Sequence, residues 1–258
     1  FGSVSKAAQY SEGFFGYLLP WGTMSYWGAQ VILNLVGAVP VVGEALVTWV
    51  RGDFLISGAT LNRFFAIHVA VIPLILVGLV FIHLVALHHV GSNNPDGVDI
   101  KKVKGADGIP LDGIPFHPYY TVHDLVGIVV FLFIFSIILF FFPDGGGYLL
   151  EKPNYEPANP LKTPLHIAPV WYYTPFYAIL RAVPSKIGGI IAMGGAIAIL
   201  FVLPWLDKSP VKSIRYKGWM SKVWLAIFVV SFVSLGYLGA VSATPVKTLL
   251  SQIFTILY

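Results

Sequence analysis

The sequence predicts an all-α protein whose helices cross a membrane several times, and three observations support this fold class. Apolar residues make up 57% of the 258 residues and charged residues only 11%, which is too apolar for a soluble domain. The apolar residues also occur in blocks of about 20, the length that spans a bilayer as a helix. The basic residues behind the net charge of +4 lie in short connections, where they bear on membrane topology and not on nucleic-acid binding.

The absence of cysteine limits the chemistry of the chain. With no cysteine there is no disulfide, no thiolate ligand and no iron–sulfur cluster on this sequence. Any metal or haem would therefore have to be held by histidine.

The first predicted element is a moderately apolar helix over residues 1–19, which resembles the second half of a membrane-spanning helix. Pro20 and Gly22 end it, and the aromatic residues that follow suit a membrane interface. Residues 31–52 contain a proline, glycines and two charged residues, too many interruptions for a full span. Short helices on the surface are expected there.

The central element is the stretch 63–94, which is almost wholly apolar between residues 64 and 87 and which two histidines interrupt. His68 and His83 are fifteen positions apart, so at about 100° per residue they lie near one face, roughly 22 Å apart along the axis. Ionisable side chains are costly inside a bilayer and are usually functional. Two imidazoles on one face at different depths favour axial ligation of two stacked haems. Two histidines hydrogen-bonded between packed helices are the alternative.

Three further spans are expected, over residues 122–142, about 187–206 and about 219–237. A final apolar segment, residues 246–258, is too short to cross a bilayer.

The loops between the spans predict their orientation. Basic residues concentrate at 101–104 and 207–222, two loops that are an even number of spans apart and so share one side. By the positive-inside rule that side is cytoplasmic, and the proline-rich connection 143–175 lies outside.

Five segments together resemble cytochrome b of the quinol–cytochrome c reductase complex, in its bacterial form. They keep the order of that family and read LPWGTMSYWGAQVI, LNRFFAIH, HHVGSNNP, HPYYTVHD and NPLKTPLHIAPVWYYTPFYAILRAVPSKIGG. The resemblance implies a dihaem cytochrome b helix bundle followed by C-terminal helices. Residues 1–142 would be the central part of the haem-binding domain, and residues 143–258 the C-terminal domain with the outer quinol-site loop. The N-terminal helices of the family are expected to be missing from this sequence.

The resemblance implies that His68 and His83 are metal ligands of two b-type haems, near the outer and the inner side respectively. Each would supply one of two axial ligands, because the partner histidines of the family lie in the missing helices. Arg63, one turn before His68, would face a haem propionate. An ordinary interfacial arginine is the competing interpretation.

The resemblance also implies an inner quinone site formed by His88, Ser92, Asn93 and Asp124. Reduction of quinone takes up two protons, which a histidine and an aspartate at the aqueous edge can relay. A solvated helix end, where a partly cationic side chain is favourable, is the alternative for His88. His123 stands where many relatives have lysine.

An outer quinol-oxidation pocket is the third implication of the resemblance, and it would contain Tyr17, Gly28, Trp171, Tyr172, Tyr173 and Tyr177. An aromatic belt at the membrane interface is the alternative for the WYYTPFY run. The PEWY motif of the family reads here as PVWY, so Val170 replaces the glutamate credited with taking a quinol proton. We hypothesise that Glu12, one turn before Gly16, accepts that proton instead. A carboxylate at a frayed helix end is the alternative.

The resemblance therefore implies the membrane subunit of a quinol:cytochrome c oxidoreductase. It would oxidise ubiquinol or menaquinol at the outer side and pass electrons through two b-type haems to the inner quinone site, coupled to proton translocation. The expected partners are a Rieske iron–sulfur protein, a cytochrome c-type subunit, a second copy of the complex and the lipid bilayer, in a bacterial inner membrane. Nucleic acid is not expected.

Two other functions remain open at this point. A dihaem anchor of a hydrogenase or formate dehydrogenase would use the same histidines, but the PVWY loop and the SNNP segment argue against it. A haem-free proton-coupled transporter would show no b-type bands in a reduced-minus-oxidised spectrum.

Overall fold

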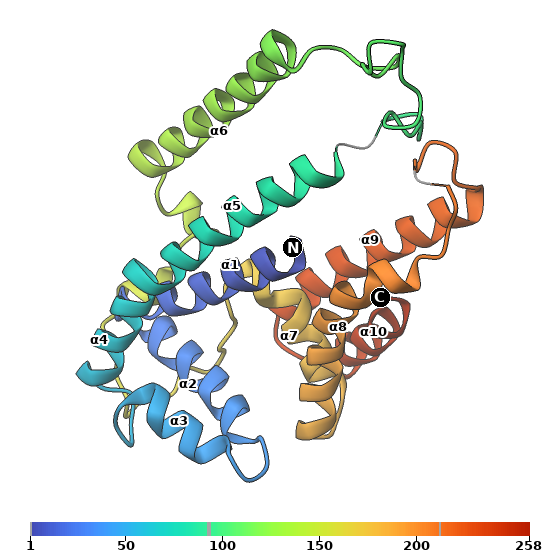
Figure 1. The fold of residues 1–258 in the computed structure, drawn as a ribbon. Helices are drawn as coiled ribbons and strands as arrows, with labels where there is room; N and C mark the ends of the chain where they lie inside the picture. The colour runs from blue at the N-terminus through green and yellow to red at the C-terminus, as the bar shows by residue number, and fades with distance from the viewer. Residues whose placement is uncertain (1, 92–93, 212) are drawn as a thin grey trace.

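The structure is a computed structural model that describes residues 2–91, 94–211 and 213–258. All regular elements in these ranges are helices (Figure 1), and the described residues form no strand. Four helices are long and apolar enough to cross a membrane: Gly58–Val90, Phe116–Phe141, Lys186–Leu206 and Trp219–Ala240. The predicted all-α, multi-pass fold class is confirmed.

The N-terminal helices build a compact cluster around one aromatic side chain. They are α1 (Gly2–Tyr17), α2 (Thr23–Gly37), α3 (Gly43–Arg51) and α4 (Gly58–Ala66). Phe64 of α4 is fully buried, and its ring meets those of Phe14 and Phe15 on α1 at centroid distances of 5.3 and 4.8 Å. Such edge-to-face contacts fix how α1 crosses α4.

The prediction of short surface helices over 31–52 is right for α3 and wrong for α2. Helix α2 begins at Thr23, and Tyr26, Ala29 and Leu33 along it are buried in the same core as Phe64. These residues recur at helical spacing, so the helix continues through residue 37 as a core element.

The histidine helix changes its winding next to His68. Helix α4 passes into a π turn, Ile67–Val71, and then into α5, Ile72–Val90. Pro73 follows directly and has no amide hydrogen to donate, which favours a wider turn before it. Because a π turn accommodates one extra residue, His68 and His83 are related as if about fourteen α-helical steps apart, and both still lie near one face.

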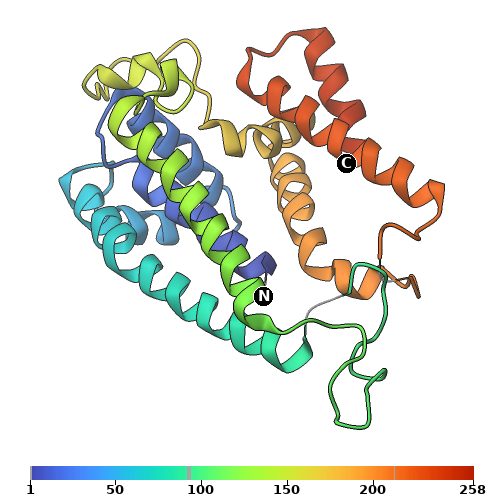
Figure 2. The same ribbon diagram turned by 90° about the horizontal axis from the view of Figure 1, so that it is seen from above.

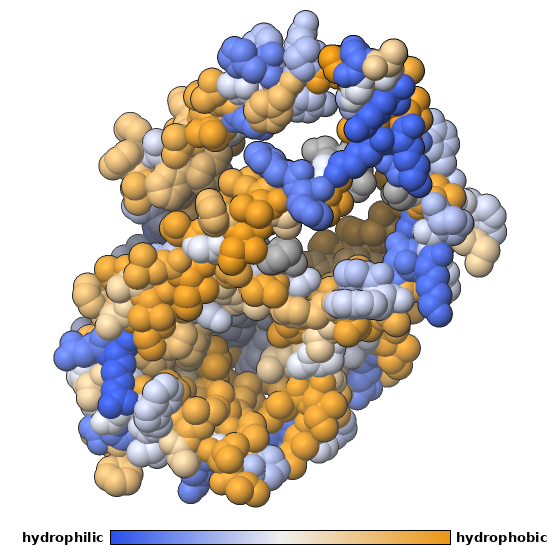
Figure 3. Space-filling model, viewed as in Figure 1, coloured by the Kyte–Doolittle hydropathy of each residue, from blue (hydrophilic) through white to orange (hydrophobic). Residues whose placement is uncertain are grey.

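Helix α6, Thr121–Phe141, follows a second π segment, Phe116–Tyr120, and none of its residues is buried. It lies at the edge of the molecule (Figure 1). Apolar side chains cover the helices in the view of Figure 3, whereas hydrophilic ones gather on the loops. Faces of this kind belong in contact with lipid or with other helices.

The C-terminal helices form a second cluster, which stands beside the first in Figure 2. They are α7 (Thr174–Ala182), α8 (Lys186–Leu206), α9 (Trp219–Ala240) and α10 (Pro245–Leu257). Arg181 of α7 donates hydrogen bonds to the carbonyls of Leu238, Gly239 and Val241. It thereby satisfies carbonyls at the end of α9 that the helix itself leaves unpaired.

Two loops that the sequence predicts to share one side are in contact. Arg215 donates a 2.5 Å hydrogen bond to Asp96, and Ser213 donates one of 2.6 Å to the carbonyl of Pro95. The loop after α5 therefore meets the loop after α8, as expected. Their assignment to the cytoplasm stays a prediction.

Candidate functional site

His68 is held against α1 by one residue. Its Nδ1 donates to the backbone carbonyl of Glu12, 3.1 Å away, and lies 3.0 Å from the Glu12 carboxylate oxygen Oε1. Both of these oxygens are acceptors, so Nδ1 carries the proton. The lone pair of Nε2 is then available for a metal, which is the arrangement that a ligating histidine requires.

A glycine on α1 makes room for this ring. A Cβ atom added to Gly16 would lie 2.5 Å from Cε1 of His68, closer than real atoms approach. Only glycine therefore lets the imidazole pack so closely against α1. Among the described residues no group of three metal-ligating side chains comes together. A haem iron needs only one or two ligands from the protein. The His68 imidazole, whose Nδ1 is bonded to Glu12, fits one of these.

The positions of the other two predicted haem residues, His83 and Arg63, do not test their predicted roles. His83 lies on an exposed face of α5. Arg63 donates to the backbone carbonyl of Trp49 on α3, and its guanidinium lies over Gly52. Because Arg63 is tied to α3, its contact with a haem propionate stays a prediction.

The predicted inner site is only partly described. His88 lies in the last turn of α5 and Asp124 in the first turn of α6, and both side chains are exposed. His123 meets Tyr120 edge-on, with ring centroids 6.1 Å apart. The two remaining members, Ser92 and Asn93, lie outside the described residues. The inner site stays a prediction.

The outer pocket brings together four positions that the sequence singles out. The end of α1, the start of α2 and the segment before α7 enclose a small cavity of about 20 Å³. It is lined by Phe14, Tyr17, Leu18, Ser25, Gly28, Ala29, Ile32, Pro169, Val170 and Tyr173. A Cβ on Gly28 would lie 3.5 Å from the Tyr17 ring, an ordinary contact that would narrow the cavity.

The aromatic run after Val170 divides between two neighbouring cavities. Tyr173 also lines an apolar cavity of about 490 Å³, together with Tyr177, Phe176 and residues of α1, α2 and α8. Its hydroxyl donates to the carbonyl of Tyr10. Tyr172 packs over α1, where its hydroxyl would lie 2.7 Å from a Cβ at Gly13.

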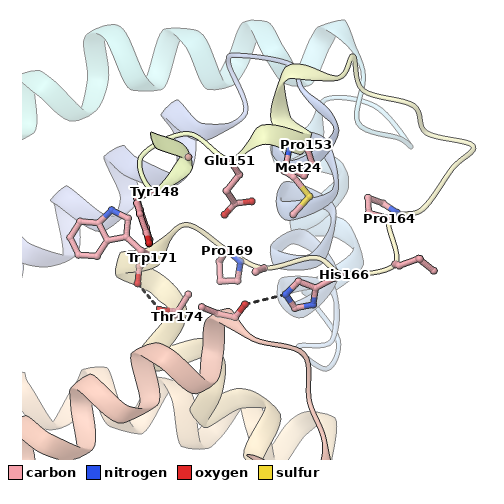
Figure 4. Close-up of a pocket in the computed structure, with 13 residues that line it drawn as sticks. Met24, Tyr148, Glu151, Pro153, Pro164, His166, Pro169, Trp171 and Thr174 are labelled. Carbon is pink, nitrogen blue, oxygen red and sulfur yellow. Dashed lines mark hydrogen bonds between the residues drawn. The ribbon is translucent and has the colours of Figure 1, made fainter. Parts of the chain in front are cut away.

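Trp171 does not face the outer pocket. Its side chain is 62% exposed and lines a third cavity of about 480 Å³ (Figure 4). This cavity also contains two residues to which the sequence gave no role, Glu151 and His166. Burial raises the pKa of the Glu151 carboxyl above its usual value, and the nearby His166 imidazole lowers it by a smaller amount. No sequence pattern around Glu151 marks it, because its setting depends on how the connection folds back.

Asn154 fixes that connection on α2. It is 5% exposed, its amide donates to Ser25 Oγ at 2.8 Å, and its Oδ1 accepts from Ser25 N at 2.7 Å. The backbone of Thr23 also donates to the Glu156 carbonyl at 2.9 Å. Residues 152–158 thus sit on the N-terminal cluster, so the predicted domain boundary at 142 does not separate their contacts.

The predicted role of Glu12 stays untested, but its position is informative. The carboxylate points to His68, and its second oxygen, Oε2, is buried without a hydrogen-bond partner among the described residues. This contact supports a part in orienting the imidazole. It does not favour a part in taking a proton from quinol.

The fold and site define a multi-pass helical membrane protein with a membrane histidine suited to haem and an aromatic pocket beside it. Two family models match the chain: cytochrome b(N-terminal)/b6/petB over residues 2–175, and cytochrome b(C-terminal)/b6/petD over residues 157–258. The chain belongs to the cytochrome b family.

Individual relatives agree with this assignment. The chain is 64% identical to cytochrome b of Allochromatium vinosum, over all of this chain and 64% of that protein. It is 49% identical to cytochrome b of Rhodospirillum rubrum, over all of this chain and 60% of that protein. The structure resembles a solved chain of a hyperthermophilic respiratory Complex III with a TM-score of 0.87 and 37% identity, over 99% of this chain and 65% of that one. The chain therefore spans less than two thirds of the length of these relatives.

Proposed function

We propose that this chain is the cytochrome b subunit of a quinol:cytochrome c oxidoreductase and that it oxidises quinol in the outer pocket. The observation that carries the proposal is the position of α1. Glu12 and Gly16 of this helix hold the His68 ring, while Phe14 and Tyr17 line the outer pocket. A single helix would thus connect the proposed haem ligand to a pocket whose aromatic and apolar lining suits quinol.

The pocket residues would contact the quinol head group once their side chains move apart, because about 20 Å³ holds little more than one water molecule. Tyr17 and Tyr173 line the small cavity, and Gly28 leaves it wider because glycine has no side chain. Phe14, Ile32 and Tyr173 line both this cavity and the apolar one of about 490 Å³. The larger cavity would therefore hold the apolar tail of the quinol, as ligand sites of this composition do.

His68 and His83 would hold two b-type haems, and a bound haem supplies a one-electron acceptor. The other protein ligand of each haem would come from further cytochrome b helices. Glu12 would keep the proton on Nδ1 of His68, so that Nε2 is presented to the iron. His88, Ser92, Asn93 and Asp124 would form the inner quinone site at the far end of α5.

The wider setting follows from the same proposal. A Rieske iron–sulfur protein would take one electron from each quinol, and a cytochrome c-type subunit would receive it. We infer a dimer of such complexes in a bacterial inner membrane, using ubiquinol or menaquinol and contributing to a proton gradient. No observation favours the hydrogenase-type anchor or the haem-free transporter.

The test replaces each histidine by leucine in the complete protein within its complex. We expect His68→Leu and His83→Leu each to remove one b-haem signal in a redox titration followed by absorbance, because leucine cannot ligate iron. His166→Leu, a histidine of the outer connection, is the control and should keep both signals. Unchanged titrations for both His68→Leu and His83→Leu would contradict the proposal.

A further inference from the structure

We propose that Glu151, together with His166, receives one of the protons that quinol releases in the outer pocket, with Tyr17 as the link between pocket and carboxylate. The proposal rests on the proposed function and deepens it. Oxidation of quinol removes two electrons and two protons, so the pocket needs a proton acceptor within reach.

The outer pocket itself offers no suitable base. None of the ten side chains that line it carries a carboxylate or an imidazole. Burial raises the pKa of the Tyr173 hydroxyl above its usual value, so this group stays protonated at neutral pH. An acceptor must therefore lie beyond the pocket wall.

Glu151 lies behind that wall. Pro169 lines both the outer pocket and the cavity that contains Glu151. Figure 4 shows the Glu151 carboxylate directed into the cavity, on the side facing Pro169. The carboxylate is half-buried and interacts electrostatically with the Tyr17 phenol and with the His166 imidazole. Among the described residues, Tyr148 and His166 are the other titratable side chains that line this cavity, whereas Tyr17 lines the outer pocket on the far side of Pro169.

Tyr17 is placed to connect the two sites. Its ring lines the outer pocket, and its hydroxyl is buried without a hydrogen-bond partner among the described residues. A hydroxyl both donates and accepts, so it can take a hydrogen bond from quinol and give one, directly or through water, toward Glu151.

His166 is the last residue in the proposed proton path from quinol through Tyr17 and Glu151. Its Nε2 donates to the Ala240 carbonyl at 3.2 Å, and its Nδ1 lies 3.5 Å from the Ser242 hydroxyl, which can accept from the ring in its cationic form. These bonds attach the ring to the chain after α9 and keep it beside the cavity. A histidine in this place lowers the proton affinity of Glu151 and so assists release of the proton to water.

The transfer balances without any further reactant. The quinol O–H bond breaks as Tyr17 accepts that proton and passes its own to Glu151, so the phenol is unchanged and the carboxylate becomes a neutral acid. The acid then returns its proton to water. The two electrons leave through the one-electron acceptors of the proposed function, the iron–sulfur partner and the outer haem.

The first experiment compares three Glu→Gln variants in the complete, assembled complex. Quinol oxidation is followed as the first turnover of haem reduction after rapid mixing with a ubiquinol analogue. We expect Glu151→Gln to slow this step about 100-fold, since a positioned base contributes on this scale. Glu156→Gln is the matched control, because Glu156 lies in the same connection, is exposed and does not line the cavity. It should keep the parent rate. Glu12→Gln tests the competing carboxylate.

The second experiment measures the pH dependence of the same step. The rate of the parent should rise with pH as Glu151 loses its proton, and this rise should vanish in Glu151→Gln. Removing the imidazole in His166→Asn removes the influence that lowers the pKa of Glu151, so the midpoint of the rise should move to higher pH. This variant keeps Glu151 and tests the pair even where Glu151→Gln prevents assembly.

The outcomes that would overturn the role of Glu151 can be stated for each variant. A parent rate in Glu151→Gln, equal slowing in Glu156→Gln, or a midpoint that stays or falls in His166→Asn would overturn the proposal. A slow Glu12→Gln beside a normal Glu151→Gln would also overturn it. Failure of the proposed function is distinguishable, because then the parent complex itself would not reduce haem with quinol.

Discussion

Gly16 determines whether the His68 ring can pack against α1. Its missing Cβ is the space that His68 occupies, since an added methyl would lie 2.5 Å from the imidazole. At Gly28 the same methyl would meet Tyr17 at 3.5 Å, an ordinary contact. A side chain would therefore clash at Gly16 but not at Gly28.

We therefore expect Gly16→Ala to displace the His68 ring and to remove or shift the signal of the outer haem. Gly28→Ala should leave both haem signals in place. Redox titration of the two variants in the assembled complex measures this difference. Identical titration curves for Gly16→Ala and the parent would show that the ring does not need this space.

Residues of the candidate site differ in how far the sequence could predict them. Tyr17, Gly28, Val170 and Tyr173 meet in one pocket, as the resemblance implies. The contact of Glu12 with His68 and the pairing of Glu151 with His166 could not be predicted. Both depend on how distant segments fold together, and no local pattern encodes such contacts.

At the level of elements, length and hydropathy predicted the membrane helices well. The expected span 122–142 is α6, Thr121–Phe141, and the expected span 187–206 is α8, Lys186–Leu206. Long apolar blocks bounded by proline, glycine or charge leave little freedom in where a helix ends. The π turn at Ile67–Val71 was not predicted, because apolar periodicity does not distinguish a π turn from an α-helical one.

The connection between α6 and α7 depends on a single buried amide. Asn154→Ala would leave Ser25 Oγ and Ser25 N without their partner in a buried setting. We expect a loss of about 1–3 kcal/mol in stability and faster proteolysis of the connection. Thermal unfolding and limited proteolysis of the complex measure these effects.

Asn159→Ala is the control for this prediction. Its side chain is exposed and accepts only from the backbone of Leu161, so little stability should be lost. In a double-mutant cycle, Asn154→Ala and Ser25→Ala should be strongly non-additive. Additive losses would mean that the two residues act independently.

At the scale of the whole molecule, the loops predict a testable topology. The chain has no cysteine, so an introduced cysteine can be labelled without background. Lys102→Cys and Lys208→Cys should react with a membrane-impermeant maleimide from the same side. Leu161→Cys, at a position 95% exposed in the outer connection, should react only from the opposite side. Labelling of positions 102 and 161 from one side would refute the orientation.

In the proposed arrangement, helix α1 also couples the absorbance of the outer haem to what binds in the pocket. One face of this helix touches His68 through Glu12 and Gly16, and another lines the pocket through Phe14 and Tyr17, all within two turns. A molecule that settles between Phe14 and Tyr17 must push on the same turn that orients the imidazole. Ligands of different size would then give different absorbance spectra of the haem without contacting it.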